Sequence, residues 1–269
     1  MRRALIYFLL AVFGALMVFP FIWMVLISFK VREEIARGNT FLPDIWTLQN
    51  YVTVFTRPDV FILSWFRNSV VVTATATTIV LFTSSLVGFV FAKFNFRFKN
   101  GLFWFLLATM MVPAQTTMIP SFLLINGIGL YDKLAALIVP GMVAGFGIFL
   151  CRQFIADVPD SLCEAALIDG ANAFYIYFRI IVPLIRPAIG ALAIFTFLQY
   201  WNDYMTPLLY LNRPQNMTMS LAIQFFSDNR SRDVGAIMAV ATLVMLPVTT
   251  VFMIFQKQFI RSVAITGMK

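Results

Sequence analysis

The 269-residue chain contains no histidine and only two cysteines, Cys151 and Cys163. Without histidine, the chain lacks the usual general base, the usual proton relay and the commonest nitrogen ligand of metal ions. The spacing of the two cysteines matches no metal-binding motif, and we interpret both as small apolar residues that fill space. We therefore expect no metal site and no catalytic residues. An intramembrane enzyme would need a serine, aspartate or lysine constellation, which the sequence does not show.

Charged residues are also scarce, at 12% of the chain, whereas hydrophobic residues make up 61% and the mean hydropathy is +0.86. So little polar surface cannot cover a soluble globule of this length. The net charge of +8 is interpreted as contact with lipid headgroups, because no basic stripe alternates with exposed aromatic residues as in nucleic-acid-binding proteins. The composition therefore predicts a membrane protein that contacts lipid and no nucleic acid.

Long apolar runs recur along the chain, and a helix crosses the hydrocarbon of a bilayer with roughly 20 residues. Six spans are expected, at about residues 4–29, 68–92, 101–125, 134–152, 187–211 and 234–257. The first begins like a signal peptide, but its apolar run exceeds the usual length of roughly 7–15 residues, so we interpret it as a retained helix. The predicted fold class is an all-α membrane protein with six transmembrane helices in a single domain, 1–269. Six spans place both termini on one side, and the basic turn near residues 92–100 favours the cytoplasm.

The second expected span is rich in small and hydroxyl residues, among them Thr73, Thr77, Ser84, Ser85 and Gly88. Small residues allow helices to approach closely. We therefore expect this helix to face protein rather than lipid.

Polar residues interrupt the third and fifth expected spans. Pro113 and Pro120 flank a polar stretch and predict a break or kink in the third span, either beside a wet pathway or satisfied by neighbouring helices. Asp203 is costly at membrane depth and should face the bundle, a cavity or the interface, where Trp201 suits the aromatic belt. The candidate residues for a translocation path are Gln115, Gln199, Asn202 and Asp203.

The segment 153–183 is a polar island between two apolar spans and is expected to form two short helices joined at Gly170. Ser161 and Glu164 match a capping box. In this motif the side chain of each residue accepts a hydrogen bond from the backbone N–H of the other. Ala165 and Ala166 form helix with little bulk, which permits close approach to another surface. Gly170 is placed to end the first helix with a left-handed residue.

In the second of these helices, apolar residues at offsets of three and four form one stripe, after which Pro183 ends the helix. The stripe predicts either an interaction surface or packing onto the protein's own helices. It consists of Phe174, Tyr177, Phe178 and Ile181.

The run Glu164-Ala165-Ala166-Leu167-Ile168-Asp169-Gly170-Ala171, followed by Ile180 and Pro183, resembles the EAA loop of ABC importer permeases. The whole chain is similar to the carbohydrate-uptake branch, in particular to the second permease subunit of maltose and sn-glycerol-3-phosphate type transporters. The resemblance implies a type I ABC importer permease core with cytoplasmic coupling helices. It implies ATPase-coupling roles for Glu164, Ala165, Ala166, Asp169, Gly170, Ala171, Ile180 and Pro183.

The same resemblance implies a transport subunit that couples ATP hydrolysis by partner ATPases to alternating-access import of a sugar, sugar phosphate or polyol. The implied partners are a second permease, two ATPase subunits and an extracytoplasmic solute-binding protein, in a bacterial or archaeal inner membrane. The chain contains no phosphate-binding loop, so ATP and Mg are expected on the ATPases, and this chain is expected to bind no cofactor. The alternative is an ion-coupled secondary transporter, which usually carries ionisable groups at mid-membrane.

Overall fold

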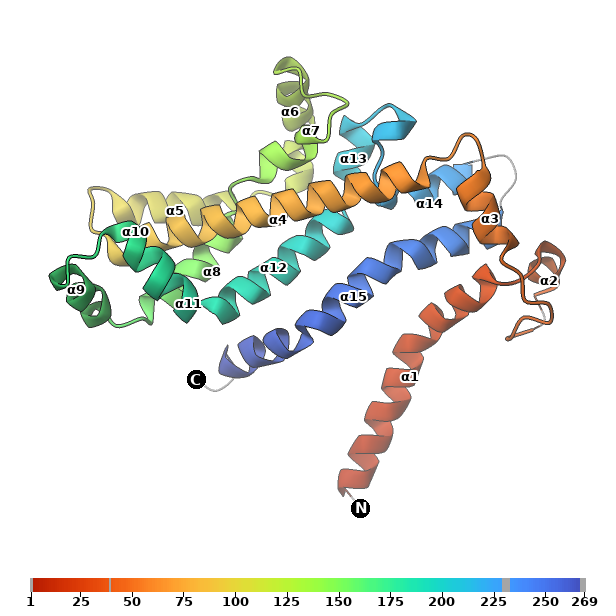
Figure 1. Ribbon diagram of the computed structural model, residues 1–269, viewed down its shortest axis with the longest axis horizontal. Coiled ribbons are helices and arrows are strands. Elements are labelled where there is room, and N and C mark those ends of the chain that lie inside the picture. Colours follow the sequence, from red (N-terminus) through yellow and green to blue (C-terminus); the bar gives the residue numbers. More distant parts are fainter. Residues whose placement is uncertain (1, 39, 229–232, 267–269) are drawn as a thin grey trace.

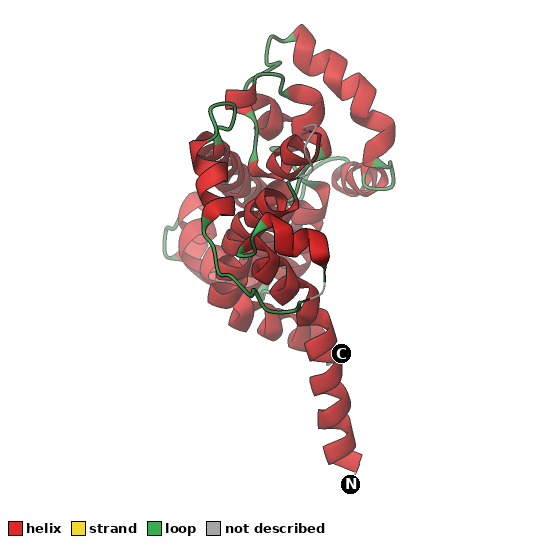
Figure 2. Ribbon diagram, turned by 90° about the vertical axis from the view of Figure 1, so that its right-hand side faces the viewer, coloured by secondary structure: helices red, strands yellow, loops and turns green. Residues whose placement is uncertain are grey.

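The computed structural model describes residues 2–38, 40–228 and 233–266. Within these ranges every regular element is a helix and none is a strand (Figure 2). The predicted all-α class is therefore confirmed. Three helices are long and apolar enough to cross a membrane, namely α1 (Arg2–Ser28), α4 (Ile62–Lys93) and the part of α15 (Val234–Thr266) up to Ile254.

Three further segments each consist of two helices that meet at a bend. α5 (Lys99–Thr109) and α6 (Ala114–Gly127) meet at 98°, and residues 135–141, which contain α7 (Ala135–Ile138), meet α8 (Gly145–Ala156) at 46°. Residues 173–184 meet α12 (Arg186–Trp201) at 79°. The described residues therefore hold three continuous spans, or up to six when each bent pair counts as one.

The remaining elements are short and connect the spans. They are α2 (Arg32–Arg37), α3 (Gln49–Thr56), α9 (Asp160–Ile168), α10 (Ala173–Ile176), a π-helical turn (Tyr177–Ile181), α11 (Val182–Leu184), α13 (Met205–Tyr210) and α14 (Met219–Asp228), with 3-10 turns at Val139–Gly141 and Pro214–Asn216. In Figure 1, α9 and α10 lie at one end of the long axis, and α2, α3 and α14 lie at the other. We call these the α9 end and the α3 end.

Two of the expected spans differ from single straight helices. The third, expected over 101–125, bends sharply before Pro113, which has no N–H and precedes the first residue of α6 in an extended conformation. The fifth, expected over 187–211, ends at Trp201, because Asp203 Oδ1 accepts a hydrogen bond from the Thr206 N–H at 3.2 Å and begins the separate helix α13.

Helix α4 is the central element of the bundle. It runs along the long axis of the molecule (Figure 1) and packs against α8, α12 and α14. Some of the small and hydroxyl residues of its sequence lie inside, with Thr73, Ser84 and Ser85 all at most 3% exposed, whereas Thr75 and Thr78 are exposed. One face of α4 therefore packs against protein as expected, while the opposite face is exposed.

Two glycines set the distance between α4 and α8. A Cβ atom on Gly88 would lie 2.9 Å from the backbone nitrogen of Arg152 and from Cβ of Cys151, and a Cβ atom on Gly147 would overlap the Ser84 hydroxyl. A backbone atom cannot move aside as a flexible side chain can. The two helices can therefore approach this closely only with hydrogen in place of a side chain.

At the α3 end, polar side chains of α4 hold the connection 213–219 in place. The indole of Trp65, which is fully buried, donates to the Pro214 carbonyl at 2.6 Å. Asn68 donates to the carbonyls of Gln215 and Met217, and Ser69 accepts from the Met219 N–H. Because buried backbone groups need partners, these bonds fix the start of α14 against α4.

A buried ion pair orders the connection that follows α1 at the same end. Lys30 Nζ lies 3.2 Å from Glu34 Oε1, and the two side chains are 5% and 7% exposed. Glu34 also accepts from the Thr40 hydroxyl at 2.6 Å and from the Asp44 N–H at 3.0 Å. These interactions, with the Thr40 hydrogen bond the largest, lower the pKa of Glu34 to about 2, against the opposing effect of burial.

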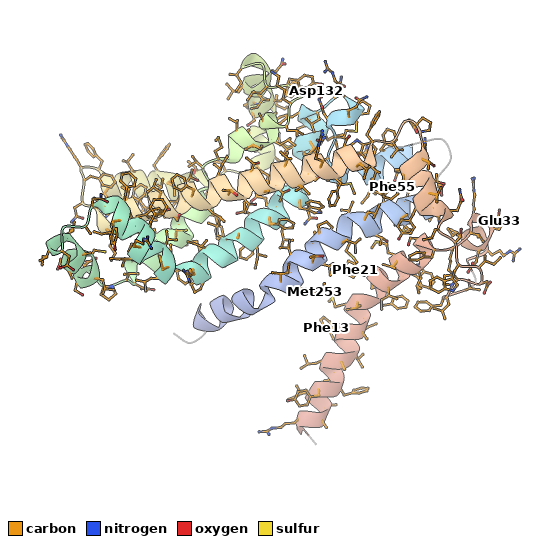
Figure 3. The ribbon with its side chains drawn as sticks, in the orientation of Figure 1. Phe13, Phe21, Glu33, Phe55, Asp132 and Met253 are labelled. Carbon is orange, nitrogen blue, oxygen red and sulfur yellow. The ribbon has the colours of Figure 1, made fainter. Side chains whose placement is uncertain are left out.

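Helix α1 stands apart from the bundle. No residue in its most apolar window is buried, and its main contacts are with α15. Figure 3 shows that Phe21 lies where α1 approaches α15, whereas Phe13, which is 60% exposed, lies where the two helices have diverged. Most of α1 is thus available to lipid or to another protein.

Replacing Gly88 with alanine should destabilise the chain, although alanine favours a helix more than glycine does. Because the added methyl group meets the α8 backbone, we expect a loss of about 1–3 kcal/mol in the free energy of unfolding. Gly14→Ala is the matched control, since nothing lies within 4 Å of its Cβ position. Thermal unfolding of the purified variants in detergent measures the effect. Equal midpoints for the two variants would contradict the close α4–α8 contact.

The Glu34 network should make stability depend on pH in the acid range. The folded-state pKa of about 2 lies below the unfolded value of 4.5, so the stabilisation is present above pH 4.5 and is lost as the pH falls toward 2. We expect Glu34→Gln to lower the thermal midpoint at pH 7 and to differ less from wild type at pH 3. Glu33→Gln is the control, because Glu33 is exposed. If both variants behave alike at pH 7, the network does not stabilise this end.

Candidate functional site

The segment 153–183 projects beyond the bundle at the α9 end (Figure 1). Its first helix, α9, has no buried residue, and Leu167 and Ile168 are 57% and 87% exposed. Glu164, Ala165, Asp169 and Gly170 are also exposed, whereas Ala166 is half-buried. An exposed helix with apolar residues at its tip is a surface suited to contact with another protein.

The end of α9 is a Schellman motif built on Gly170. Gly170 has φ +80°, and its N–H donates to the Leu167 carbonyl at 3.0 Å, while the Ala171 N–H donates to the Ala166 carbonyl at 2.9 Å. These are the two hydrogen bonds that define the motif. The predicted left-handed conformation at Gly170 is confirmed.

The predicted capping box at the start of α9 is wrong. The helix begins at Asp160 after Pro159, and no side chain caps it. Pro159 fixes the entry to the helix in an extended conformation, so Ser161 lies inside the first turn, where its hydroxyl cannot act as the cap. Glu164 therefore has no capping role, and its side chain is exposed on the surface of α9.

The second half of the segment begins with an asparagine cap that the sequence reading missed. The Asn172 side chain accepts a hydrogen bond from the Tyr175 N–H at 2.8 Å and so starts α10. The helix then widens into the π-helical turn Tyr177–Ile181. Pro183 cannot donate to the Arg179 carbonyl, which removes one α-helical hydrogen bond at this point. The helix continues to Leu184, one residue past Pro183, before the bend into α12.

The apolar stripe predicted for this helix is divided between the interior and the surface. Tyr177 and Ile181 are 2% and 0% exposed and belong to the core around α8 and α12, whereas Phe174 and Phe178 are 68% and 53% exposed. The burial of one pair confirms packing onto the protein's own helices for that part of the stripe, and an interaction surface stays a prediction for the other part. Packing onto the protein's own helices applies to the first pair, and only the second pair is available to a partner.

A shallow cavity of about 510 Å³ lies between the two halves of the segment. It brings together five of the eight residues expected to couple to an ATPase, and two others that sequence reasoning missed, Tyr175 and Arg179. The five are Ala166, Asp169, Gly170, Ala171 and Ile180. Glu164, Ala165 and Pro183 lie outside the cavity. Tyr175 and Arg179 lie four residues apart, and this spacing places them on one face of the helix that begins after the Asn172 cap. The spacing is the sequence signal that could have identified them.

The segment is tied to the end of α4 by two sets of polar contacts. The Ser85 and Tyr177 hydroxyls lie 2.7 Å apart in the interior. Lys93 Nζ donates to the Val158 carbonyl and to Asp160 Oδ1 at 2.6 Å. The hydrogen bond from Lys93 lowers the pKa of Asp160. The segment and α4 are therefore linked at both the interior and the rim of the α9 end.

The four candidate path residues lie in two separate parts of the chain. Gln199 is near the end of α12, Asn202 and Asp203 follow it, and Gln115 lies in the first turn of α6. Gln115, Gln199 and Asn202 are exposed, and Asp203 is half-buried. Trp201, expected at the aromatic belt, is instead 2% exposed, because its indole donates to the Val244 carbonyl of α15. Within the described residues, Gln115 forms no hydrogen bond with the other three.

The described part of the chain offers no group of three metal-ligating side chains. Together, the fold and the segment 153–183 define a class: an all-helical, multi-pass membrane protein that presents a helical projection at one end.

The family model described as "Binding-protein-dependent transport system inner membrane component" matches residues 84–265. The chain belongs to this family. It is a non-catalytic membrane permease subunit of a transport system of the inner membrane.

Curated relatives cover nearly the full length. The chain is 32% identical to the "Arabinooligosaccharides transport system permease protein AraQ" of Bacillus subtilis (strain 168), over 94% of this chain and 91% of that protein. It is 32% identical to the "Lactose transport system permease protein LacG" of Rhizobium radiobacter, over 95% and 92%. The resemblance to carbohydrate-uptake permeases is therefore confirmed.

Solved structures support the fold. A chain of a bacterial ABC transporter "involved in the import of the acidic polysaccharide alginate" superimposes with a TM-score of 0.85 at 20% identity, covering 94% of this chain and 95% of that one. At this identity the likeness concerns the fold, and it agrees with the type I importer permease core expected from the sequence.

Proposed function

We propose that this chain is a permease subunit of an ATP-driven importer of oligosaccharides or related sugars, and that segment 153–183 receives the work of partner ATPases. The observation that carries the proposal is the exposed helix α9 with its rigid Gly170 end, joined to the central helix α4. The names of the relatives, which specify arabinooligosaccharides, lactose and diacetylchitobiose, support the carbohydrate class of the cargo.

In this proposal the surface of α9 docks on an ATPase subunit. Ala165 and Ala166 leave the helix slim, so another protein surface can approach its backbone closely. Leu167 and Ile168 supply the exposed apolar contact, and Glu164 and Asp169 supply acidic groups for polar contacts. The cavity beside Gly170 and Ala171 accepts a side chain of the partner, with Ile180 as its apolar wall and Pro183 at the bend behind it.

The docked segment must transmit displacement without folding back on itself. The Schellman hydrogen bonds fix the turn between α9 and α10, and the Ser85–Tyr177 and Lys93–Asp160 contacts connect it to α4. Closure of the ATPases would then move the segment and α4 together and change the packing of the bundle between inward-open and outward-open states.

In this proposal the remaining partners contact the two ends of the molecule and the exposed helix α1. A second permease subunit and lipid cover the apolar surface that α1 presents, and a solute-binding protein faces the α3 end. ATP and Mg bind to two ATPase subunits at the α9 end, which lies in the cytoplasm together with both termini. A related structure is titled "in complex with alginate pentasaccharide-bound periplasmic protein", which supports a binding protein as partner.

We assign Gln199, Asn202, Asp203 and Gln115 to the translocation path, because they place polar groups at the surface of otherwise apolar segments. On the path, sugar hydroxyls would form hydrogen bonds with these side chains in place of those that they form with water. No described carboxylate is buried in the middle of a span, which leaves little basis for ion coupling.

Replacing Gly170 with valine should uncouple ATP hydrolysis from uptake. A β-branched residue at φ +80° costs about 1–3 kcal/mol, so the turn should change shape and coupled transport should fall by roughly fivefold or more. The assay is sugar uptake and binding-protein-stimulated ATP hydrolysis in proteoliposomes that contain all subunits.

Two further variants test the specificity of that effect. Gly38→Val imposes similar strain, at φ +67°, at the opposite end of the molecule and should leave coupling intact. Gly170→Asn tolerates the left-handed conformation and should retain most activity. Normal uptake by Gly170→Val, or equal loss in Gly38→Val, would sink the proposed role of the segment.

Cysteine introduced at Gln199, Asn202 or Asp203 should react with a water-soluble thiol reagent in at least one transport state. The experiment uses a Cys163→Ser background, since Cys163 is the native cysteine that is not fully buried. Thr196→Cys, which lies on α12 with Gln199 but is 4% exposed, is the protected control. Protection of all three positions with and without ATP would remove them from the path.

A further inference from the structure

A second cavity, of about 420 Å³, lies at the α9 end but outside the segment 153–183. Six of its seven lining residues come from the turn between α4 and α5 and from the first turn of α5, within residues 95–101. The seventh is Arg152 of α8. The cavity therefore lies where two apolar helices leave the spanning region, and no role described so far uses it.

Arg152 lines this cavity, and one nitrogen of its guanidinium group lacks a hydrogen-bond partner. Its Cζ atom lies over the Phe103 ring, 4.0 Å from the ring centroid, in a cation–π contact. Its Nε is buried and has no hydrogen-bond partner, and no carboxylate in the described ranges forms an ion pair with it. A buried donor without an acceptor is destabilising, and an anion held by the guanidinium group would offset this effect.

Neither cation of the cavity forms an ion pair with a described residue, although Asp160 lies near enough to Lys99 for a weaker electrostatic interaction. Lys99 lines the cavity, is half-buried, and has no ion pair with any described residue. The neighbouring Lys93 is already engaged, because Asp160 and the Val158 carbonyl accept from it. Two unpaired cations, Lys99 and Arg152, thus share one polar cavity.

The backbone adds two donors in the same place. Lys99 donates its N–H to the Phe96 carbonyl and Leu102 donates to the Phe98 carbonyl, but the N–H groups of Asn100 and Gly101 between them have no acceptor in the described structure. Both residues line the cavity. They open an 11-residue helix, whose N-terminal dipole also favours an anion.

Exposed apolar side chains adjoin the cavity along α5. Phe98, Leu102 and Phe105 are 69%, 50% and 71% exposed. A free anion would gain nothing from this surface, whereas acyl chains would cover it. We propose that the cavity binds the phosphate group of an anionic phospholipid, with Arg152, Lys99 and the N–H groups of Asn100 and Gly101 as donors and with the acyl chains lying against α5.

The key variant is Gly101→Asp. Nothing lies within 4 Å of the Cβ position of Gly101, so the side chain fits, and an acidic residue in the first turn favours the helix. The new carboxylate would occupy the donors and repel phosphate without removing any packing of Arg152 on Phe103. Arg152→Gln tests the guanidinium directly. Arg186→Gln, an exposed cation at the start of α12, is the control for charge alone.

Binding is measured by native mass spectrometry of the full-length chain with added phosphatidylglycerol or phosphatidylcholine, and by thermal stabilisation in nanodiscs of each lipid. We expect wild type and Arg186→Gln to retain phosphatidylglycerol preferentially, and Gly101→Asp and Arg152→Gln to bind it about fivefold to tenfold more weakly. A separate arm adds inorganic phosphate to the detergent-solubilised chain, where little stabilisation is expected.

Three outcomes would overturn the proposal. The first is equal retention of phosphatidylglycerol by wild type and Gly101→Asp, which would mean that the cavity is not the site. The second is an equal loss in Arg186→Gln, which would indicate a general effect of charge. The third is full stabilisation by inorganic phosphate, which would identify a site for a free anion rather than for a lipid.

Discussion

The contact between α4 and α8 is the constraint on which the rest of the structure depends. At Gly88 the α8 backbone lies where a Cβ atom would be, and at Gly147 the Ser84 hydroxyl does. Within a bilayer, apolar side chains gain little by leaving lipid, so helices associate through close packing and through polar contacts that backbone proximity permits. The two glycines therefore permit a helix contact that a larger side chain at either position would prevent.

This contact makes α4 the common support of both ends of the molecule. At the α3 end, Trp65, Asn68 and Ser69 bind the connection that precedes α14. At the α9 end, Ser85 and Lys93 bind the segment 153–183. One helix thus joins the surface proposed for the solute-binding protein to the surface proposed for the ATPase, and a displacement at one end has a continuous physical route to the other.

Much of this could be predicted from the sequence, because hydropathy and glycine chemistry act locally. The apolar runs predicted the helical membrane fold, and the position of Gly170 at the end of a helix predicted a left-handed conformation there. The bend before Pro113 follows from the missing N–H of proline. The start of α9 was mispredicted because Ser161 and Glu164 have the spacing of a capping box, while Pro159 begins the helix earlier. The burial of Trp201 depends on the Val244 carbonyl of a helix distant in the chain, which no local pattern reveals.

The helix that carries the divided apolar stripe contains the π-helical turn Tyr177–Ile181. A π-helix contains one more residue in each hydrogen-bonded ring than an α-helix does. The angular positions of the side chains therefore shift across this turn relative to those of a regular α-helix. Each residue advances an α-helix by about 100°, so the length of this turn sets the azimuth of α9 relative to α12. Removing a single residue there would rotate the whole projection by more than a quarter of a circle while leaving every side chain on its surface unchanged.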